Sequence, residues 1–163
     1  MVECNFAPAA PNEPTVFGAC RPGYPATSPS DDAIEGWIQH IHANDIERVC
    51  CLLDDELAAY DSLLSRYRER FGDERVRHVP IPDYEVVSQT AFHREIVPFL
   101  RETDHASERV VVHCSAGIGR TGHVLALWLV YGRGYGLQEA VKTVRSTGRE
   151  PLEAATTTQL ARI

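Results

Sequence analysis

A cysteine and an arginine six positions apart enclose a glycine-containing turn that can hold an anion. The turn has the sequence Cys114-Ser115-Ala116-Gly117-Ile118-Gly119-Arg120. Backbone N–H groups at the start of a helix are unpaired and lie at the positive end of its dipole, so Ser115 through Arg120 can surround one phosphate group. Gly117 and Gly119 permit the tight or positive-φ geometry that such a nest needs. Arg120 adds a planar fork that can donate to two oxygens of the anion.

Cys114 lies at the base of this turn, where it can act as a nucleophile. The field that favours a bound anion also favours a thiolate, and cysteines at helix N-termini are often ionised at neutral pH. Thr121 follows the arginine, and its hydroxyl can approach the sulfur and stabilise the thiolate before attack and as it leaves. His113 points to the opposite side of its strand, so we expect it to order the turn through a hydrogen bond rather than act as a base.

The turn needs a strand before it and a helix after it, and its flanks predict both. Residues 109–113 form a short β-branched run typical of a central strand. Residues from 120 or 121 to about 131 are apolar nearly all round, which predicts a helix enclosed by the rest of the domain. The alternative is a glycine-rich strand-to-helix turn that holds a buried, inert cysteine.

The remaining elements alternate along the chain. Strands are expected at residues 15–20, 47–53 and 75–81. One helix is expected to begin near Ser30, with a capping box formed by Asp32 and Glu35, and a second near Tyr60. A third is expected to begin at Ser88, and Pro98 should kink or split it. A last amphipathic helix holds residues 137–144. This pattern predicts an α/β fold with one mainly parallel central sheet flanked by helices. Residues 1–14 are expected to form an extended N-terminal arm before a domain of residues 15–163.

Composition and net charge limit which binding partners and which cellular compartment are expected for this chain. The 163 residues carry a net charge of −7, which argues against a nucleic-acid partner. The longest apolar run has eight residues, well below the roughly 20 of a membrane helix, so no membrane partner is expected. The five cysteines have no repeating or zinc-like spacing and no signal-like segment begins the chain, so we expect a reduced, cytoplasmic protein without a metal or another cofactor.

The ten residues 113–122, HCSAGIGRTG, resemble the signature of the cysteine-based protein tyrosine phosphatases, H-C-x-x-G-x-x-R-[ST]-G, at every position. The order of elements over residues 16–149 resembles the compact dual-specificity branch of that family. The resemblance implies a two-step reaction, in which Cys114 attacks the phosphorus and water then hydrolyses the phosphocysteine. It implies phosphorylated proteins as substrates, phosphotyrosine first and phosphoserine or phosphothreonine second.

The resemblance also implies an acid that protonates the leaving group, and Asp83 is the expected residue. It follows Ile81 and Pro82 on a loop after a strand, 31 residues before Cys114, where the family keeps its aspartate. The larger members of the family have tryptophan where Ile81 stands. Glu85, Asp54 and Asp55 are weaker candidates, and Asp83 can instead be a turn aspartate after proline.

Three further positions are candidates for supporting roles. Gln159 resembles the glutamine that orients the hydrolytic water in the larger family members, although a polar residue of a C-terminal helix fits equally well. Cys50 or Cys51 can trap Cys114 as a disulfide, but neighbours in a strand point to opposite faces and buried small residues are the favoured interpretation. Tyr24 can line the mouth of the pocket.

Two other functions remain open from the residues alone. One is a phosphate-binding module with weak catalysis, and the other is a rhodanese-like sulfurtransferase, which also uses a cysteine in an anion-binding loop. Arg120-Thr121-Gly122 and Asp83 favour the phosphatase. The loop contains no lysine, whereas family members that act on phosphoinositides tend to carry additional lysine or arginine there, so the resemblance favours a protein monophosphate over a phosphoinositide. The sequence makes no prediction of oligomeric state.

Overall fold

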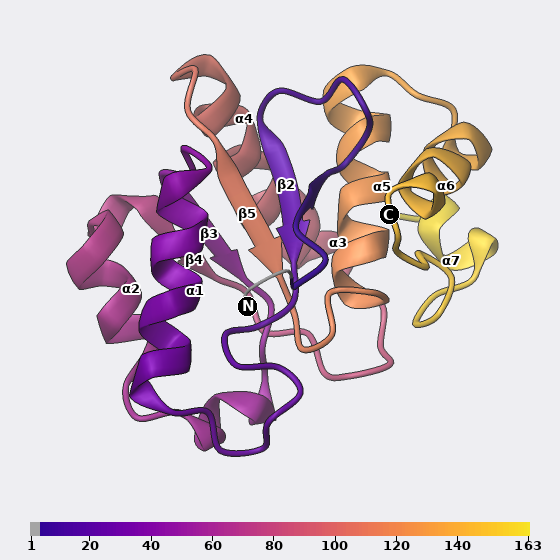
Figure 1. Ribbon diagram of the computed structural model, residues 1–163. Coiled ribbons are helices and arrows are strands. Elements are labelled where there is room, and N and C mark those ends of the chain that lie inside the picture. The colour runs from indigo at the N-terminus through magenta and orange to yellow at the C-terminus, as the bar shows by residue number, and fades with distance from the viewer. Residues whose placement is uncertain (1–3) are drawn as a thin grey trace.

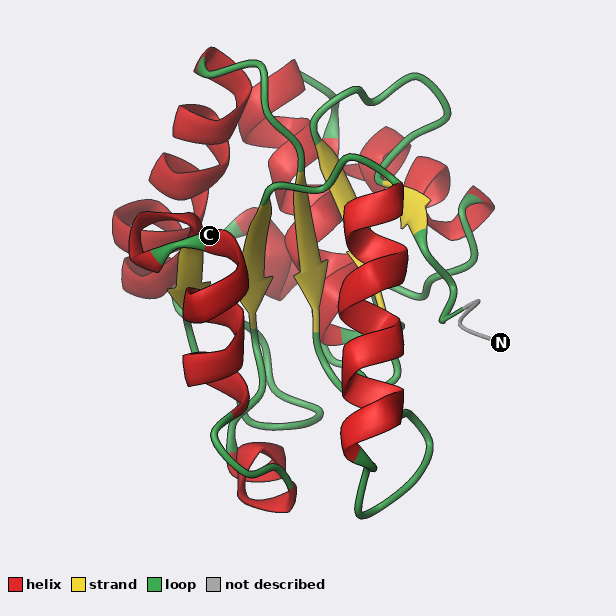
Figure 2. Cartoon of the chain, turned by 60° about the vertical axis from the view of Figure 1, so that its left-hand side comes forward, coloured by secondary structure: helices red, strands yellow, loops and turns green. Residues whose placement is uncertain are grey.

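The computed structural model describes residues 4–163, which build one sheet with helices on both faces (Figures 1 and 2). Within these residues the sheet has five strands in the order β1-β2-β5-β3-β4. Neighbours among β2, β5, β3 and β4 are parallel, and β1 is an antiparallel edge strand beside β2. The strands are Ala7–Pro8 (β1), Val16–Ala19 (β2), Arg48–Cys51 (β3), Val76–His78 (β4) and Val110–His113 (β5). The predicted α/β fold with a mainly parallel sheet is confirmed.

The helices divide between the two faces of the sheet (Figure 1). One face is covered by α1 (Asp31–Ala43) and α2 (Leu63–Phe71). The other face carries α3 (Gln89–Ala91), α4 (Val97–His105), α5 (Arg120–Arg133), α6 (Leu137–Ser146) and α7 (Thr157–Ala161). Helix α5 is apolar nearly all round because it packs against the sheet, α4 and α6.

Strand β5 lies at the centre of the sheet, with β2 on one side and β3 on the other. Its four residues are buried and alternate between faces, so Val110 and Val112 face α5 while Val111 faces α1 and α2. Cys114 continues the alternation on the α5 side. The central strand therefore delivers the cysteine to the carboxyl edge of the sheet, directly below the start of α5.

Local details of three predicted helices differ from expectation. Helix α1 is capped by Ser30, whose Oγ accepts from the Ala33 N–H at 3.1 Å, in place of a box at Asp32. Helix α2 begins at Leu63, after a separate 3₁₀ turn at Asp55–Ala59. The helix after Ser88 is divided by a π-helical turn, Phe92–Ile96, just before Pro98, whose missing N–H and bulky ring disrupt the regular i to i−4 pattern.

Residues 4–14 are packed on the domain, whereas residues 1–14 were expected to form an extended arm; residues 1–3 lie outside the described range. Strand β1 pairs with β2, and Ala9 and Ala10 are buried. The buried carboxylate of Glu13 accepts from the Thr15 N–H and pairs with Arg133. Strand pairing with β2 and polar contacts hold this segment in place. Its sequence therefore has no periodic pattern of apolar residues that would predict the packing. Within the described range, no helix is long and apolar enough to cross a membrane.

Candidate active site

The turn between β5 and α5 forms an open loop of backbone donors. The N–H groups of residues 115–119 have no acceptor among the described residues, and α5 starts at Arg120. Gly117 has a φ of +74°, and a Cβ there would lie 2.5 Å from the carbonyl oxygen of Ala19. Glycine is therefore required both for the turn and for its close approach to β2. The cysteine at the base, Cys114, is 3% exposed.

Arg120 is fixed beside this loop although it is almost fully buried, at 2% exposure. Its Nη1 donates to the carbonyl oxygen of Ile81 at 2.8 Å, and its Nη2 forms an ion pair with Glu56. The same Nη2 lies 3.3 Å from Oδ1 of Asp83. Burial alone would lower the pKa of Arg120, but the hydrogen bond to Glu56 and the nearby anionic groups raise it above its ordinary value. The guanidinium is a permanent cation with a set orientation.

Glu56 is a site residue that the sequence analysis missed. It lies in the 3₁₀ turn Asp55–Ala59 and its carboxylate accepts from Arg120. Burial raises the pKa of Glu56, but the hydrogen bonds from Arg120 and from backbone N–H groups outweigh burial and lower it. Glu56 sits in the acidic run 54–56, and nothing in the local sequence distinguishes it from Asp54 and Asp55, which form no ion pair with Arg120.

The loop forms the floor of a pocket of about 210 Å³. Cys114, Ser115, Ala116, Gly119 and Arg120 line it, together with Tyr24, Asp83, Tyr84, Glu153 and Ala154. The side chain of Asp83 is 56% exposed, and its Oδ1 accepts from the Tyr84 N–H at 3.0 Å. The structure thus brings the predicted nucleophile, cation and acid to one cavity. Gly117 turns toward β2, and Ile118 lines a neighbouring cavity.

Residues 26–134 match the family described as "Polymorphic toxin system, DSP-PTPase phosphatase" (Tc-R-P). The chain belongs to this DSP-PTPase family. It is 31% identical to human dual specificity protein phosphatase 2 over 71 residues, covering 44% of this chain and 23% of the human protein. It is also 31% identical to dual specificity protein phosphatase Mpk3 of Drosophila melanogaster over 83 residues, covering 51% of this chain and 20% of that protein. The chain therefore matches less than a quarter of the length of these curated relatives.

Solved structures resemble nearly the whole of this DSP-PTPase chain. The active form of Tk-PTP has a TM-score of 0.70 and 26% identity, covering 91% of this chain and 89% of that one. Kinase associated phosphatase has a TM-score of 0.71 at 19% identity, covering 90% of this chain and 82% of that one. At 19% identity, the similarity to kinase associated phosphatase shows a shared fold only.

His113 supports the loop between β5 and α5 of this DSP-PTPase domain from the opposite face of β5. Its Nδ1 lies 3.1 Å from the carbonyl oxygen of Cys114, and its Nε2 lies 2.9 Å from the hydroxyl of Tyr67. Burial lowers the pKa of His113 to about 4, so the ring is neutral at pH 7. Because a carbonyl only accepts, Nδ1 carries the proton and Nε2 accepts from Tyr67. The ring therefore fixes the peptide that precedes the loop.

Thr121 and Gln159 are the residues predicted to act on the sulfur and on the hydrolytic water, and the structure places Gln159 away from the pocket. Thr121 is buried at the start of α5, and its hydroxyl has no hydrogen-bond partner among the described groups. Gln159 is exposed and does not line the pocket. Its side chain accepts from the Thr156 N–H at 2.8 Å, completing a capping box at α7. A local helix cap thus replaces the water-orienting role expected of Gln159.

The neighbouring cysteines in β3 are buried and reduced. Cys50 faces the α5 side and Cys51 the α1 side, as alternation in a strand requires. Burial raises the pKa of Cys51 to about 12 and that of Cys50 well above its ordinary value, so both are neutral thiols. In the structure neither is bonded to Cys114.

A second group of residues that the sequence analysis missed binds the carbonyl oxygens of the loop between β5 and α5. The amide of Asn5 donates to the carbonyl oxygens of Ala116, at 3.1 Å, and Gly117, at 3.4 Å. Arg149 donates from Nη1 to the Gly117 oxygen at 2.6 Å and from Nη2 to the Asn5 oxygen at 2.7 Å. Arg149 is 3% exposed and has no acidic partner among the described residues, and burial lowers its pKa to about 10. These donors occupy the loop carbonyls and leave its N–H groups facing the pocket.

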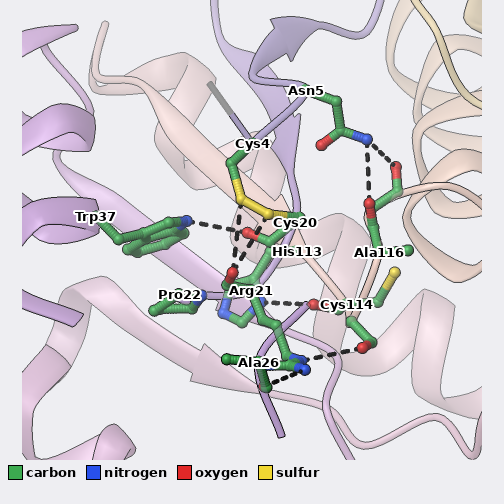
Figure 3. The surroundings of a disulfide bond; sticks show 12 residues. Cys4, Asn5, Cys20, Arg21, Pro22, Ala26, Trp37, His113, Cys114 and Ala116 are labelled. Atoms are coloured by element: carbon green, nitrogen blue, oxygen red, sulfur yellow. Dashed lines mark hydrogen bonds between the residues drawn. A yellow bond between two sulfur atoms is a disulfide. The ribbon is translucent and has the colours of Figure 1, made fainter. Parts of the chain in front are cut away.

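The segment that carries Asn5 is joined to the end of β2 by a disulfide between Cys4 and Cys20 (Figure 3). The next residue, Arg21, donates from its backbone N–H to the carbonyl oxygen of Ser115 at 2.8 Å and from Nε to the Ser115 Oγ at 3.0 Å. The expectation of a wholly reduced chain is wrong at this pair. The antiparallel pairing of β1 with β2 brings the Cα atoms of Cys4 and Cys20 within 5.1 Å of each other. The two cysteines are 16 residues apart in sequence, and this spacing does not predict a disulfide.

Proposed function

We propose that this chain is a protein phosphatase that hydrolyses phosphotyrosine through a phosphocysteine on Cys114, with phosphoserine and phosphothreonine as further substrates. One observation supports this best: Cys114, Arg120 and Asp83 line a single pocket above a loop of unpaired N–H groups. The loop offers donors for the phosphate oxygens, the guanidinium balances their charge, and the carboxyl group lies at the rim where the leaving group would be.

In the first step the thiolate of Cys114 attacks the phosphorus in line with the ester oxygen. The S–P bond forms as the P–O bond breaks, and Asp83 gives its proton to the departing oxygen. The phosphate competes with Asp83 for Nη2 of Arg120, and we propose that substrate binding frees the carboxyl group for this proton. Thr121, whose buried hydroxyl has no other partner, is proposed to donate to the sulfur when it leaves.

In the second step water attacks the phosphorus of the phosphocysteine. Asp83, now a carboxylate, accepts a proton from the water as the S–P bond breaks, and inorganic phosphate leaves with the thiolate restored. Each role uses a group that lines the pocket or, for Thr121, a buried hydroxyl next to Arg120 at the start of α5. The residues supply the whole sequence of proton transfers.

The charges around the pocket favour a substrate with one phosphate. Among the described residues that line it, Arg120 is the only basic side chain, while Asp83 and Glu153 place carboxylates at the rim. A second phosphate would meet these carboxylates without a cation to balance it. The matched family is described as part of polymorphic toxin systems, and we propose that the chain is the phosphatase component of such a system, acting on cytoplasmic phosphoproteins.

The direct test is the release of phosphate from an aryl phosphate and from a phosphotyrosine peptide. Cys114→Ser should abolish release and still bind the peptide, while Cys50→Ala, the matched change of a buried thiol outside the pocket, should retain turnover. Equal turnover by Cys114→Ser and the unaltered chain would exclude the proposed mechanism. Peptide binding without any phosphate release would support a binding module, and sulfur transfer from thiosulfate to cyanide would support a sulfurtransferase.

A further inference from the structure

A second and larger cavity, of about 660 Å³, adjoins the catalytic pocket. Tyr24 and Ala116 line both cavities, so the two share a wall. Beyond this wall the larger cavity is formed by Ile118 of the catalytic loop, by Trp37 and Ala33 of α1, and by the disulfide. It has the size of a typical ligand site, and the proposed phosphatase reaction gives it no role.

The lining of this cavity is mostly apolar. Trp37 forms part of it, Asn5 and Asp32 are its amide and its carboxylate, and none of the described lining residues is basic. A second phosphate or another anion would therefore find no partner in it. An apolar group would replace water against aromatic and aliphatic carbon, which is favourable by roughly 25 cal/mol for each Å² of apolar surface removed from water.

The two sides of the catalytic rim differ in chemistry. Asp83 and Glu153 form one side, while Tyr24 and Ala116 form the side that opens to the larger cavity. A peptide whose phosphate is bound above Cys114 can extend across Tyr24, and its next residue lies only about 3.8 Å further along the chain. One of the nearest side chains would therefore reach the apolar lining.

We propose that this cavity, which we call the flanking cavity, binds a large apolar side chain next to the phosphorylated residue of a protein substrate. The inference rests on the proposed phosphatase function and adds a substrate class to it. The proposal rests on the wall that the two cavities share, because Ala116 and Ile118 belong to the loop that would bind the phosphate. Occupancy of the flanking cavity would thus position the ester over the nucleophile.

The walls are fixed before any substrate binds. The indole Nε1 of Trp37 donates to the carbonyl oxygen of Cys20 at 3.0 Å, next to the disulfide (Figure 3). The ring of Tyr24 lies against the guanidinium of Arg21, with 5.4 Å between the Arg21 Cζ and the ring centroid. A preformed site loses little conformational entropy on binding, so the burial of an apolar side chain should translate into affinity.

The test compares phosphotyrosine peptides that carry leucine, phenylalanine, alanine or aspartate at each position within three residues of the phosphotyrosine. The unaltered chain should hydrolyse peptides with leucine or phenylalanine at one such position with kcat/KM roughly tenfold higher than the alanine peptide. Ala33→Trp, which fills the cavity, should remove this preference and leave the hydrolysis of a small aryl phosphate unchanged. Ala33→Leu should remove it in part.

Gln39→Trp is the matched control, because Gln39 lies exposed on the same helix and outside the cavity. It should keep both the preference and the aryl phosphate activity. Hydrolysis of aryl phosphate and of all peptides at rates independent of the flanking residue would overturn the flanking cavity alone. No hydrolysis of any phosphate ester would overturn the proposed function and the cavity's role together.

Discussion

Gly18→Ala should damage the catalytic loop from a strand that does not touch substrate. Gly18 lies in β2, and a Cβ there would lie 2.7 Å from Cζ of Arg149, 2.8 Å from Nε and 2.9 Å from Nη2. The guanidinium cannot move aside freely, because it is buried and its two outer nitrogens donate to Gly117 and Asn5. The added methyl group would push Arg149 away from the loop.

The expected magnitude follows from three contributions. Overpacking costs about 1–3 kcal/mol, and alanine recovers about 0.5–1 kcal/mol over glycine within a strand. Any loss of the hydrogen bonds from Arg149 adds to the cost, since bonds to a charged group contribute about 1.5–3 kcal/mol each. We therefore expect a loss of about 2 kcal/mol in the free energy of unfolding. Release of the Gly117 carbonyl should also lower kcat/KM on aryl phosphate by roughly tenfold to a hundredfold.

Denaturant unfolding and aryl phosphate kinetics of a double-mutant cycle provide the assay. In the Arg149→Ala background the clashing guanidinium is gone and alanine at position 18 has room, so its cost should fall by at least about 1 kcal/mol. Gly136→Ala is the control, because a Cβ at Gly136 meets nothing within 4 Å. Unchanged stability and activity of Gly18→Ala, or strictly additive effects with Arg149→Ala, would refute this reasoning.

Three other expectations concern the acid, the buried histidines and the disulfide. Asp83→Asn should lower kcat strongly for alkyl phosphates and little for activated aryl phosphates, and an equal loss on both would remove Asp83 as the leaving-group acid. Burial lowers the pKa of His113 and of His123 to about 4 from 6.5, so the unfolded chain binds protons that the folded chain does not. The free energy of unfolding should therefore be steady above pH 6.5. It should fall by up to about 3 kcal/mol per histidine as the pH decreases from 6.5 to 4. Denaturant titrations that give the same free energy of unfolding across this range would contradict the prediction. Replacement of Cys4 and Cys20 by serine should lower the free energy of unfolding by about 3 kcal/mol, because the disulfide closes a loop of 16 residues. An unchanged denaturation midpoint would count against the disulfide.

The parts of the site that follow one another in sequence could be predicted, because their signals are local. The β-branched run of β5, the glycines of the loop and the apolar length of α5 together indicate a strand, a turn and a helix around Cys114 and Arg120. Asp83 could be named only through the family resemblance. The structure adds that it lies 3.3 Å from Arg120.

The supports of the loop could not be predicted, because they are distant in sequence. Asn5 is 111 residues from Ala116, and the oxygen of Asn5 is bound by Arg149, which is 144 residues away. Neither residue carries a periodic or motif signal of its own. Gln159 shows the opposite error, since a short likeness to a functional loop concealed a helix cap that Thr156 and Gln159 form locally.

The attachment of one loop to segments that precede and follow it affects when the site can form during synthesis. Asn5 is made before the loop, but Arg149 is made after the loop and α6. A nascent chain that ends before position 149 would contain Cys114 and Arg120, yet the carbonyl of Gly117 would lack its cationic donor. The support of the loop would thus be incomplete on the growing polypeptide until translation has passed position 149.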